Sequence, residues 1–347
     1  MKTGLVCLMM AAALAAAGDE VAELNARWGK GENVTFASDR RGDPVVTLRN
    51  AHGACAVALR GAKTVSWIPA GGEEVFFVPE AGIDCKVRKW QDWVHGGMPI
   101  VWPWFGSKGM PQEGWWARKT REWGWSDEPG PFIHGFARYQ LFTVAAAGHD
   151  GARTWIKLSL RPSDETRKYL PRAFELDYTI TLGADLGFEL VTRNVDSEPF
   201  SIYEGYHPYF RVGNGFRTFV RGFDGFKYTS NRYLEYDLTH VWEGDLPIGP
   251  GCDIFDMKEM RSRTALVDPT MNRALALTTT GGRDVLTCFM PCSRWSDRDE
   301  NLLNREVKSA VCLEPANYNR PVEVKPGESH VFAMKIELGP CSAMILK

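Results

Sequence analysis

Apolar and polar residues alternate along much of this chain with a period of two, which is the spacing of strands that bury one face. The segment FELDYTITL shows the pattern most clearly, because Phe174, Leu176, Tyr178, Ile180 and Leu182 point one way and the polar residues between them point the other. Residues 183–187, which begin and end with Gly, separate it from a second such segment, FELVTRNV. Together the two segments predict a β-hairpin with one buried face.

The same alternation recurs in ACAVALRG, in WIKLSLRP and in HVFAMKIELG, with Gly, Pro, Asn and Asp between the segments. Beyond residue 18 we find no convincing amphipathic helix of ten or more residues, no heptad run and no repeat. The pattern therefore predicts an all-β fold, a large antiparallel β-sandwich. We expect residues 19–347 to form a single domain, because no low-complexity linker interrupts them.

The first eighteen residues, MKTGLVCLMMAAALAAAG, differ from the rest of the chain: one Lys, an apolar run and small residues precede Asp19 and Glu20. This is the layout of a signal peptide, and the run is short for a membrane-spanning helix. Cys7 lies inside the run and not at its end, which disfavours a lipid-modified Cys. We expect residues 1–18 to be removed and the protein to be exported to the periplasm or the cell exterior, with no membrane span in the mature chain. The alternative is that this segment is retained as a membrane anchor.

Composition narrows the classes of partner. The chain has 24% charged residues and a formal net charge of -2, so electrostatics give no reason to expect binding to nucleic acid or to an anionic membrane. Of the eight Cys, Cys7 lies in the predicted signal peptide, and an odd number remains. A complete disulfide framework is excluded, although one or two bridges stay possible. No CxxC motif or Cys/His cluster indicates a structural zinc site.

Tryptophan is concentrated in one region, with eight of the thirteen Trp between Trp90 and Trp125. Flat aromatic faces bind sugar rings by dispersion against their C–H groups. The alternative is that these residues cover one edge of the sandwich. We expect the cluster as a whole to form a binding face.

Three ionisable residues stand in unusual surroundings. His207, in EGYHPYFRVG, lies among aromatic residues, where a His is either a core residue or a proton donor. His134, in PFIHGFARYQ, has apolar neighbours that indicate a strand or its end. Glu314, in VCLEPAN, is expected at the end of a strand, because the following Pro cannot donate to a ladder. Partial burial there raises the pKa of a carboxyl group and makes it a usable base, whereas a solvent-facing strand end leaves it ordinary.

Seven motifs follow one another along the chain: GAKTVSWIP, GGMPIVWPWFG, HGFAR, YHPYFRVG, CDIFD, VCLEPAN and PGESHVFAMKI. In sequence and in order these motifs resemble the galactose mutarotase-like superfamily, and most of all its glucose-6-phosphate 1-epimerase branch. The resemblance covers residues 45–339. It implies a large bent β-sandwich and an isomerase that interconverts the α and β anomers of a hexose or hexose 6-phosphate. No metal or other cofactor is implied.

The resemblance also implies roles for individual residues. His207 corresponds to the general acid that protonates the ring oxygen, and Glu314 to the general base that removes the anomeric hydroxyl proton. Substrate contacts are implied, in chain order, for His95, Trp104, His134, Arg138 and Asp253. One positioned acid and one positioned base suffice to open and close a pyranose ring.

Two departures from the branch bear on the substrate. His95 stands where the branch usually has Arg before GG-P, and Ile254 stands where an Arg commonly follows the Asp that corresponds to Asp253. Arg carries a permanent charge and a bidentate fork for phosphate, which His does not. Because Arg138 remains, the expected partner is a small sugar or a sugar phosphate; the sequence leaves the oligomeric state open. A noncatalytic carbohydrate-binding protein and a polysaccharide-processing enzyme on the same fold are the alternatives.

Overall fold

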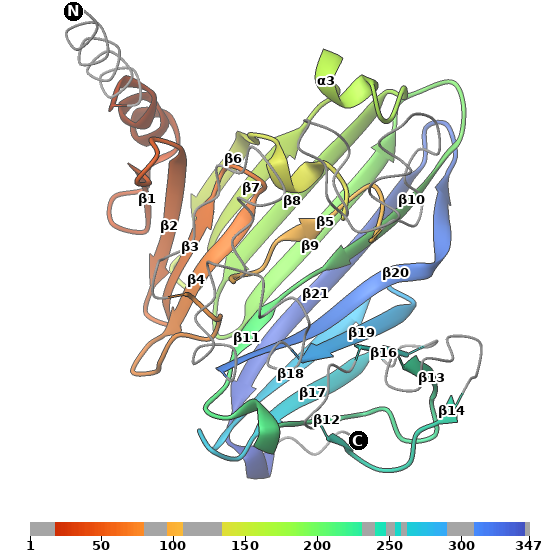
Figure 1. The fold of residues 1–347 in the computed structure, drawn as a ribbon. Helices are drawn as coiled ribbons and strands as arrows, with labels where there is room; N and C mark the ends of the chain where they lie inside the picture. Colours follow the sequence, from red (N-terminus) through yellow and green to blue (C-terminus); the bar gives the residue numbers. More distant parts are fainter. Residues whose placement is uncertain are drawn as a thin grey trace, which may run out of the picture.

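A computed structural model gives the fold of the chain (Figure 1). It describes residues 18–79, 96–106, 134–230, 240–247, 254–257, 262–289 and 309–343. Within these residues the strands form three sheets in which every pair of neighbours is antiparallel. The predicted antiparallel β-sandwich is confirmed.

The first sheet comes from the N-terminal part of the chain and is ordered β1-β2-β3-β4. Its strands are β1 (Val34–Ser38), β2 (Pro44–Asn50), β3 (Gly53–Ala58) and β4 (Lys63–Pro69). In Figure 1 it stands at one side of the larger sheets, next to β7 and β8. Apolar residues on alternate positions of β2, such as Val46 and Leu48, are fully buried in the main core.

The second sheet has the order β15-β12-β17-β18-β21-β9-β8-β7-β6 in the described part of the chain. Its strands are β6 (Thr143–His149), β7 (Thr154–Leu160), β8 (Phe174–Leu182), β9 (Leu186–Asn194), β12 (Phe219–Arg221), β15 (Leu246–Pro247), β17 (Arg263–Asp268), β18 (Arg273–Thr280) and β21 (Ser329–Gly339). The predicted hairpin lies inside this sheet, since β8 and β9 pair from Phe174↔Asn194 to Leu182↔Leu186. The alternation that predicted it is also confirmed, because every second residue of β8 is buried.

The third sheet carries the predicted catalytic residues and has the order β14-β13-β16-β19-β20-β10-β5, with β11 also paired to β20. Its strands are β5 (Ile100–Val101), β10 (Phe200–Tyr206), β11 (Tyr209–Arg211), β13 (Lys227–Ser230), β14 (His240–Val241), β16 (Ile254–Met257), β19 (Asp284–Phe289) and β20 (Ala310–Val324). The main core lies between this sheet and the second one, with Val311 and Leu313 of β20 buried in the same cluster as Phe332 and Ile336 of β21.

Helices are few in the described residues, but one contradicts the prediction. Residues 18–28 are helical, where no helix of ten or more residues was expected. Val21, Leu24 and Trp28 lie on one side of this helix and pack against the core, a spacing that fits an amphipathic helix. The remaining elements are short: α3 (Asp164–Arg167), η2 (Ala137–Tyr139), η3 (Gly215–Arg217) and η7 (Cys341–Ala343). Among the described residues, none of the helices combines the length and the apolar composition that crossing a bilayer requires.

Candidate active site

The register of the third sheet brings His207 and Glu314 together. Strand β11 pairs Tyr209 with Cys312, and β10 pairs Gly205 with Ala316. Both pairings belong to one register, which, continued across Pro208, places His207 opposite Glu314. Directly opposed residues share one face of a sheet with Cβ atoms about 5 Å apart. Two residues more than a hundred positions apart in the chain therefore become neighbours through strand pairing alone.

The two side chains do meet. Nε2 of His207 lies 3.5 Å from Oε1 of Glu314, and their side chains are 12% and 4% exposed. They lie on the face of β20 that points away from the main core, since Val311 and Leu313 point into that core and Cys312, Glu314 and Ala316 do not. Burial of both groups beside each other is the arrangement that an acid–base pair needs.

The expectation that Pro315 ends the strand is wrong. Strand β20 continues to Val324, and Pro315 pairs with Val285 of β19. On the other side of β20, β11 pairs with Cys312 and β10 pairs with Ala316, and the described ladder has no pair between these two positions. The reason is that β10 ends just before His207 and β11 begins just after Pro208. Glu314 is thus a mid-strand carboxyl group beside a local break in the sheet and not a strand-end charge.

The environment of Glu314 alters its acidity. Burial raises the pKa of its carboxyl group to about 8, and the positive charge of Arg138 opposes part of that rise. Arg138 itself is buried, with 4% of its surface exposed, in the single turn η2. Desolvation lowers its pKa, and Glu314 and Tyr209 are among the groups that raise it again. The carboxyl group can therefore change its protonation state close to neutral pH.

His134 does not lie inside a strand, and the residues directly before it, which would decide whether it follows a strand end, are outside the described residues. It lies in a turn before η2 with a φ of 69°, followed by Gly135 with a φ of 78°. Its Nδ1 accepts a hydrogen bond from the backbone N–H of Gly106 at 3.2 Å, which in a neutral ring puts the proton on Nε2. The imidazole packs edge-on against that of His207, with ring centroids 5.4 Å apart. His134 is thus a hydrogen-bond donor held next to the acid–base pair.

Two neighbours of the pair were not predicted. Tyr209 stacks on His207, with ring centroids 4.7 Å apart and planes 18° from parallel. Cys312 is fully buried and contributes a sulfur atom to a group that also contains the ligand atoms of His207 and Glu314. Period-two spacing was the available signal, because His207 and Tyr209, like Cys312 and Glu314, are two positions apart in the chain.

The other predicted contact residues have different outcomes. Trp104 is 1% exposed and lies in the main core, where it packs edge-on against Phe136 and Tyr169. Its ring is therefore not presented to a ligand in this structure. His95 and Asp253 lie outside the described residues, as does most of the Trp-rich region. The two Trp of that region that are described, Trp102 and Trp104, are both core residues, and Nε1 of Trp102 donates to the Thr192 hydroxyl at 3.0 Å.

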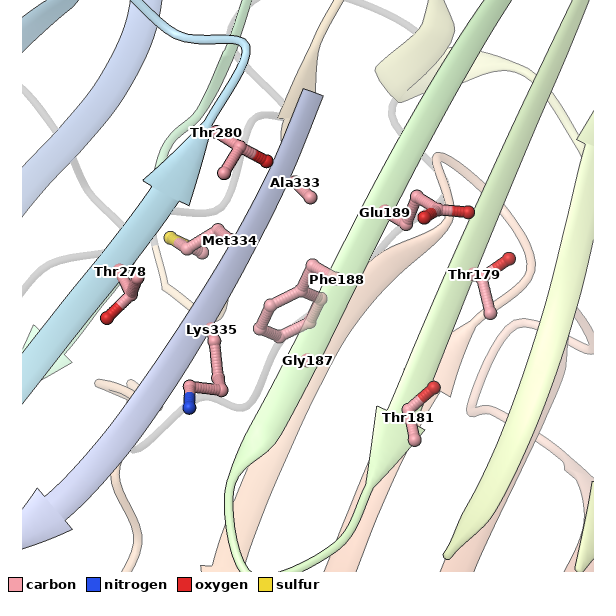
Figure 2. A pocket seen from close by; sticks show the side chains of 10 residues that line it. All are labelled: Thr179, Thr181, Gly187, Phe188, Glu189, Thr278, Thr280, Ala333, Met334 and Lys335. Atoms are coloured by element: carbon pink, nitrogen blue, oxygen red, sulfur yellow. The ribbon is translucent and has the colours of Figure 1, made fainter. Parts of the chain in front are cut away.

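A shallow groove of about 360 Å³ lies elsewhere on the molecule (Figure 2). It is lined by Thr179, Thr181, Gly187, Phe188, Glu189, Thr278, Thr280, Ala333, Met334 and Lys335. Thr179 and Thr181 alternate with Tyr178 and Ile180, which are buried in the core, so the groove is on the outer face of the second sheet. Two packed sheets, about 10 Å apart, separate it from the face that carries Glu314. It is not part of the acid–base site.

Comparison with known proteins agrees with this architecture. A protein from Cenchrus ciliaris named "Putative glucose-6-phosphate 1-epimerase" is 27% identical over 295 residues, which cover 82% of this chain and 81% of that protein. An Escherichia coli protein of the same name is 29% identical over 173 residues, 48% of this chain and 47% of its own length.

Solved structures show the same fold. The crystal structure of a putative mutarotase from Salmonella typhimurium superposes with a TM-score of 0.74 at 21% identity, over 89% of this chain and 95% of that one. A galactose mutarotase-like protein from Clostridium acetobutylicum gives a TM-score of 0.65 at 14% identity, over 89% and 100% of the two chains. The family model described as aldose 1-epimerase matches residues 127–337, which contain His134, Arg138, His207 and Glu314. The chain belongs to the aldose 1-epimerase family.

Proposed function

We propose that this protein interconverts the α and β anomers of an aldohexose by acid–base opening and closing of the pyranose ring. The observation that carries the proposal is the buried pair formed by His207 and Glu314, with Nε2 and Oε1 3.5 Å apart. The ring oxygen and the anomeric oxygen are bonded to one carbon, so a pair of groups at this separation reaches both. Membership of the aldose 1-epimerase family supports the same reaction.

The proposed reaction needs one proton supplied and one removed. The Glu314 carboxylate takes the proton of the anomeric hydroxyl, the C1–O5 bond breaks, and protonated His207 gives its proton to the ring oxygen. The product is the open-chain aldehyde. After rotation about C1–C2 the O5 hydroxyl attacks the other face of the carbonyl carbon, His207 takes back the O5 proton and Glu314 returns its proton to the new anomeric hydroxyl. The cycle leaves both side chains as they began.

Surrounding residues prepare the pair for this chemistry. The Tyr209 ring, stacked on His207, fixes the plane of the imidazole. Arg138 limits the rise in the pKa of Glu314, which keeps a fraction of the carboxylate ionised at neutral pH. His134 carries its proton on Nε2, because its Nδ1 accepts from Gly106, and so offers a donor to a sugar hydroxyl group beside the pair. We assign substrate contact to His134 and charge tuning to Arg138.

The proposed substrate is a hexose, and two observations disagree on whether this hexose carries a phosphate group at position 6. The curated relatives carry the name glucose-6-phosphate 1-epimerase, which favours a phosphorylated sugar. His95 and Ile254, in contrast, replace residues that could bind phosphate through a guanidinium fork. Export through the predicted signal peptide, residues 1–18, is part of the proposal and favours a neutral hexose, since phosphorylated sugars are scarce outside cells. Comparing the N-terminus of protein secreted by the native host with that of the full-length chain tests the export.

An anomerisation panel tests the function and the substrate together. Freshly dissolved α-glucose, α-galactose and α-glucose 6-phosphate are followed by polarimetry or proton NMR with and without the protein, and the spontaneous rate is subtracted. We expect at least one sugar to equilibrate faster with the protein. Glu314→Gln and His207→Asn each lower that rate by about 10²- to 10⁴-fold.

Matched controls exclude a general effect of substitution. Glu323→Gln changes an exposed carboxyl group on the same strand as Glu314, and His52→Asn changes an exposed His; both keep the wild-type rate. If the wild type and Glu314→Gln both bind sugar and neither accelerates anomerisation, the protein is a noncatalytic carbohydrate-binding protein and the proposed function is wrong.

A further inference from the structure

Three different ligand atoms meet on the catalytic face. A ring nitrogen of His207, the Sγ atom of Cys312 and a carboxylate oxygen of Glu314 all lie within 4.8 Å of one another. The sheet register causes this, since Tyr209 opposes Cys312 and the next pair on the same face is His207 and Glu314. Acid–base opening of a sugar ring makes no use of the thiol. Cys312 is therefore a buried nucleophilic group at the site that the proposed reaction leaves unexplained.

The geometry is close to that of a metal site. A tetrahedral Zn²⁺ with bonds of about 2.0–2.3 Å holds its ligand atoms roughly 3.3–3.8 Å apart. The distance from Nε2 of His207 to Oε1 of Glu314, 3.5 Å, already falls in that range. The sulfur lies within 4.8 Å of both, so bringing it into range requires a movement of about 1–1.5 Å. A movement of this size is within what rotation about χ1 of Cys312 gives its sulfur atom.

The ligand set selects the class of cation. Imidazole and thiolate favour Zn²⁺, Co²⁺ and Cd²⁺, whereas Mg²⁺ and Ca²⁺ prefer oxygen ligands alone. A thiolate and a carboxylate together neutralise a divalent cation, so Arg138 faces a neutral complex and does not repel it. Three protein ligands leave the fourth tetrahedral position for water or for a sugar hydroxyl group.

We propose that His207, Cys312 and Glu314 form an inhibitory site for a thiophilic divalent cation of the Zn²⁺ class. Bound there, the cation occupies the lone pairs with which His207 and Glu314 exchange protons, so it excludes catalysis and competes with the sugar. The competition rests on the proposed function, whereas binding of the cation does not.

Binding is tested with Co²⁺ as an optical probe on the full chain after removal of metals by a chelator. We expect saturation at one Co²⁺ per chain, with intense tetrahedral d–d bands and a sulfur-to-cobalt charge-transfer band. Cys312→Ser and Cys312→Ala each remove the charge-transfer band, and circular dichroism verifies that at least one of these variants is folded. Cys341→Ser, which changes another Cys that is not in a disulfide, keeps the band. A band that survives in both Cys312 variants, or no band in wild type, overturns the proposal.

Inhibition is tested separately. Zn²⁺ added to the anomerisation assay raises the apparent KM for the sugar, EDTA restores the rate, and Mg²⁺ and Ca²⁺ have no effect. Relative to its own metal-free rate, Cys312→Ser needs at least about tenfold more Zn²⁺ for half inhibition. Equal inhibition by Mg²⁺ and Zn²⁺ contradicts the site. A Cys312-dependent cobalt band in a protein that accelerates no sugar sustains the metal site and refutes the proposed function; an active protein without the band does the reverse.

Discussion

The carboxyl group of Glu314 is expected to make the anomerisation rate depend on pH within an experimentally accessible range. Burial raises its pKa to about 8 from an ordinary value of 4.5, so at pH 6 nearly all of it is protonated and is no base. Because the reaction needs the ionised carboxyl group of Glu314 together with protonated His207, we expect kcat/KM for the preferred hexose to follow a bell-shaped pH profile with one limb near pH 8. Initial rates by polarimetry in metal-free buffers measure the position of this limb. A profile without a limb near pH 8 would remove Glu314 from the role of base.

Arg138 provides the discriminating variant for the same prediction. Its charge lowers the pKa of Glu314 against the effect of burial, so Arg138→Met moves the limb set by Glu314 to higher pH and lowers the rate at pH 7. Arg153→Met, which removes an exposed guanidinium paired with Asp150, leaves the limb in place. A merely structural role for Arg138 would reduce the rate at every pH without moving the limb.

The sequence predicted His207 and Glu314 as a pair but did not predict the residues around them. His207 and Glu314 were identified through their aromatic and strand contexts together with the family motifs, and the register explains why they meet. Cys312 was missed because a single Cys inside an apolar run looks like a core residue. Only the pairing of β20 with β10 and β11 shows that Cys312 lies on the same face as His207 and Glu314, and that pairing joins segments about a hundred residues apart.

At the scale of elements, the turn that carries His134 depends on Gly135. Gly135 has a φ of 78°, and a Cβ atom at this position would collide with the backbone carbonyl of Trp102. We expect Gly135→Ala to lower the free energy of unfolding by about 2 kcal/mol or more, and to lower activity because His134 moves with the turn. Urea denaturation and the anomerisation rate measure the two effects.

Gly151→Ala is the matched control for this turn. Gly151 also has a left-handed backbone, with a φ of 89°, but no described heavy atom outside its own neighbours lies within 4 Å of the position that a Cβ atom would take there. Its substitution costs only the backbone strain, about 1–2 kcal/mol, and leaves the rate unchanged. Equal losses of stability and activity in the two variants would show that contact with Trp102 does not position His134.

Regular elements were the most predictable part of the fold. The alternation over residues 174–182 predicted β8 with its buried face, because one local pattern determines both strand and face. The break near Glu314 was not predictable, since the Pro rule concerns one strand whereas the change of partner from β11 to β10 is a property of three. The helix at residues 18–28 was missed because its apolar positions, Val21, Leu24 and Trp28, are few.

At the scale of the whole molecule, a buried polar contact joins the two large sheets directly behind the site. Glu204 of β10 has no exposed side-chain surface, and its Oε1 lies 2.7 Å from Nε2 of His330 on β21. The same oxygen accepts a hydrogen bond from Nδ2 of Asn317 on β20 at 2.9 Å. Nothing in the alternation of these segments predicts the contact, because it depends on which sheets face each other.

Removing His330 should therefore destabilise the sandwich and spare the chemistry. A buried carboxylate that loses one of its polar partners costs roughly 2–3 kcal/mol, so His330→Leu lowers the free energy of unfolding by about that amount. Adding Glu204→Gln to this variant recovers part of the loss, because an amide is less costly to bury than a charge. The pair faces the main core, on the opposite side of β10 and β20 from His207 and Glu314, so the folded variant keeps its anomerisation rate. Urea unfolding of the single and double variants, with the exposed His52→Leu as control, measures the coupling; strictly additive losses would mean that the short contact contributes nothing to holding the sheets together.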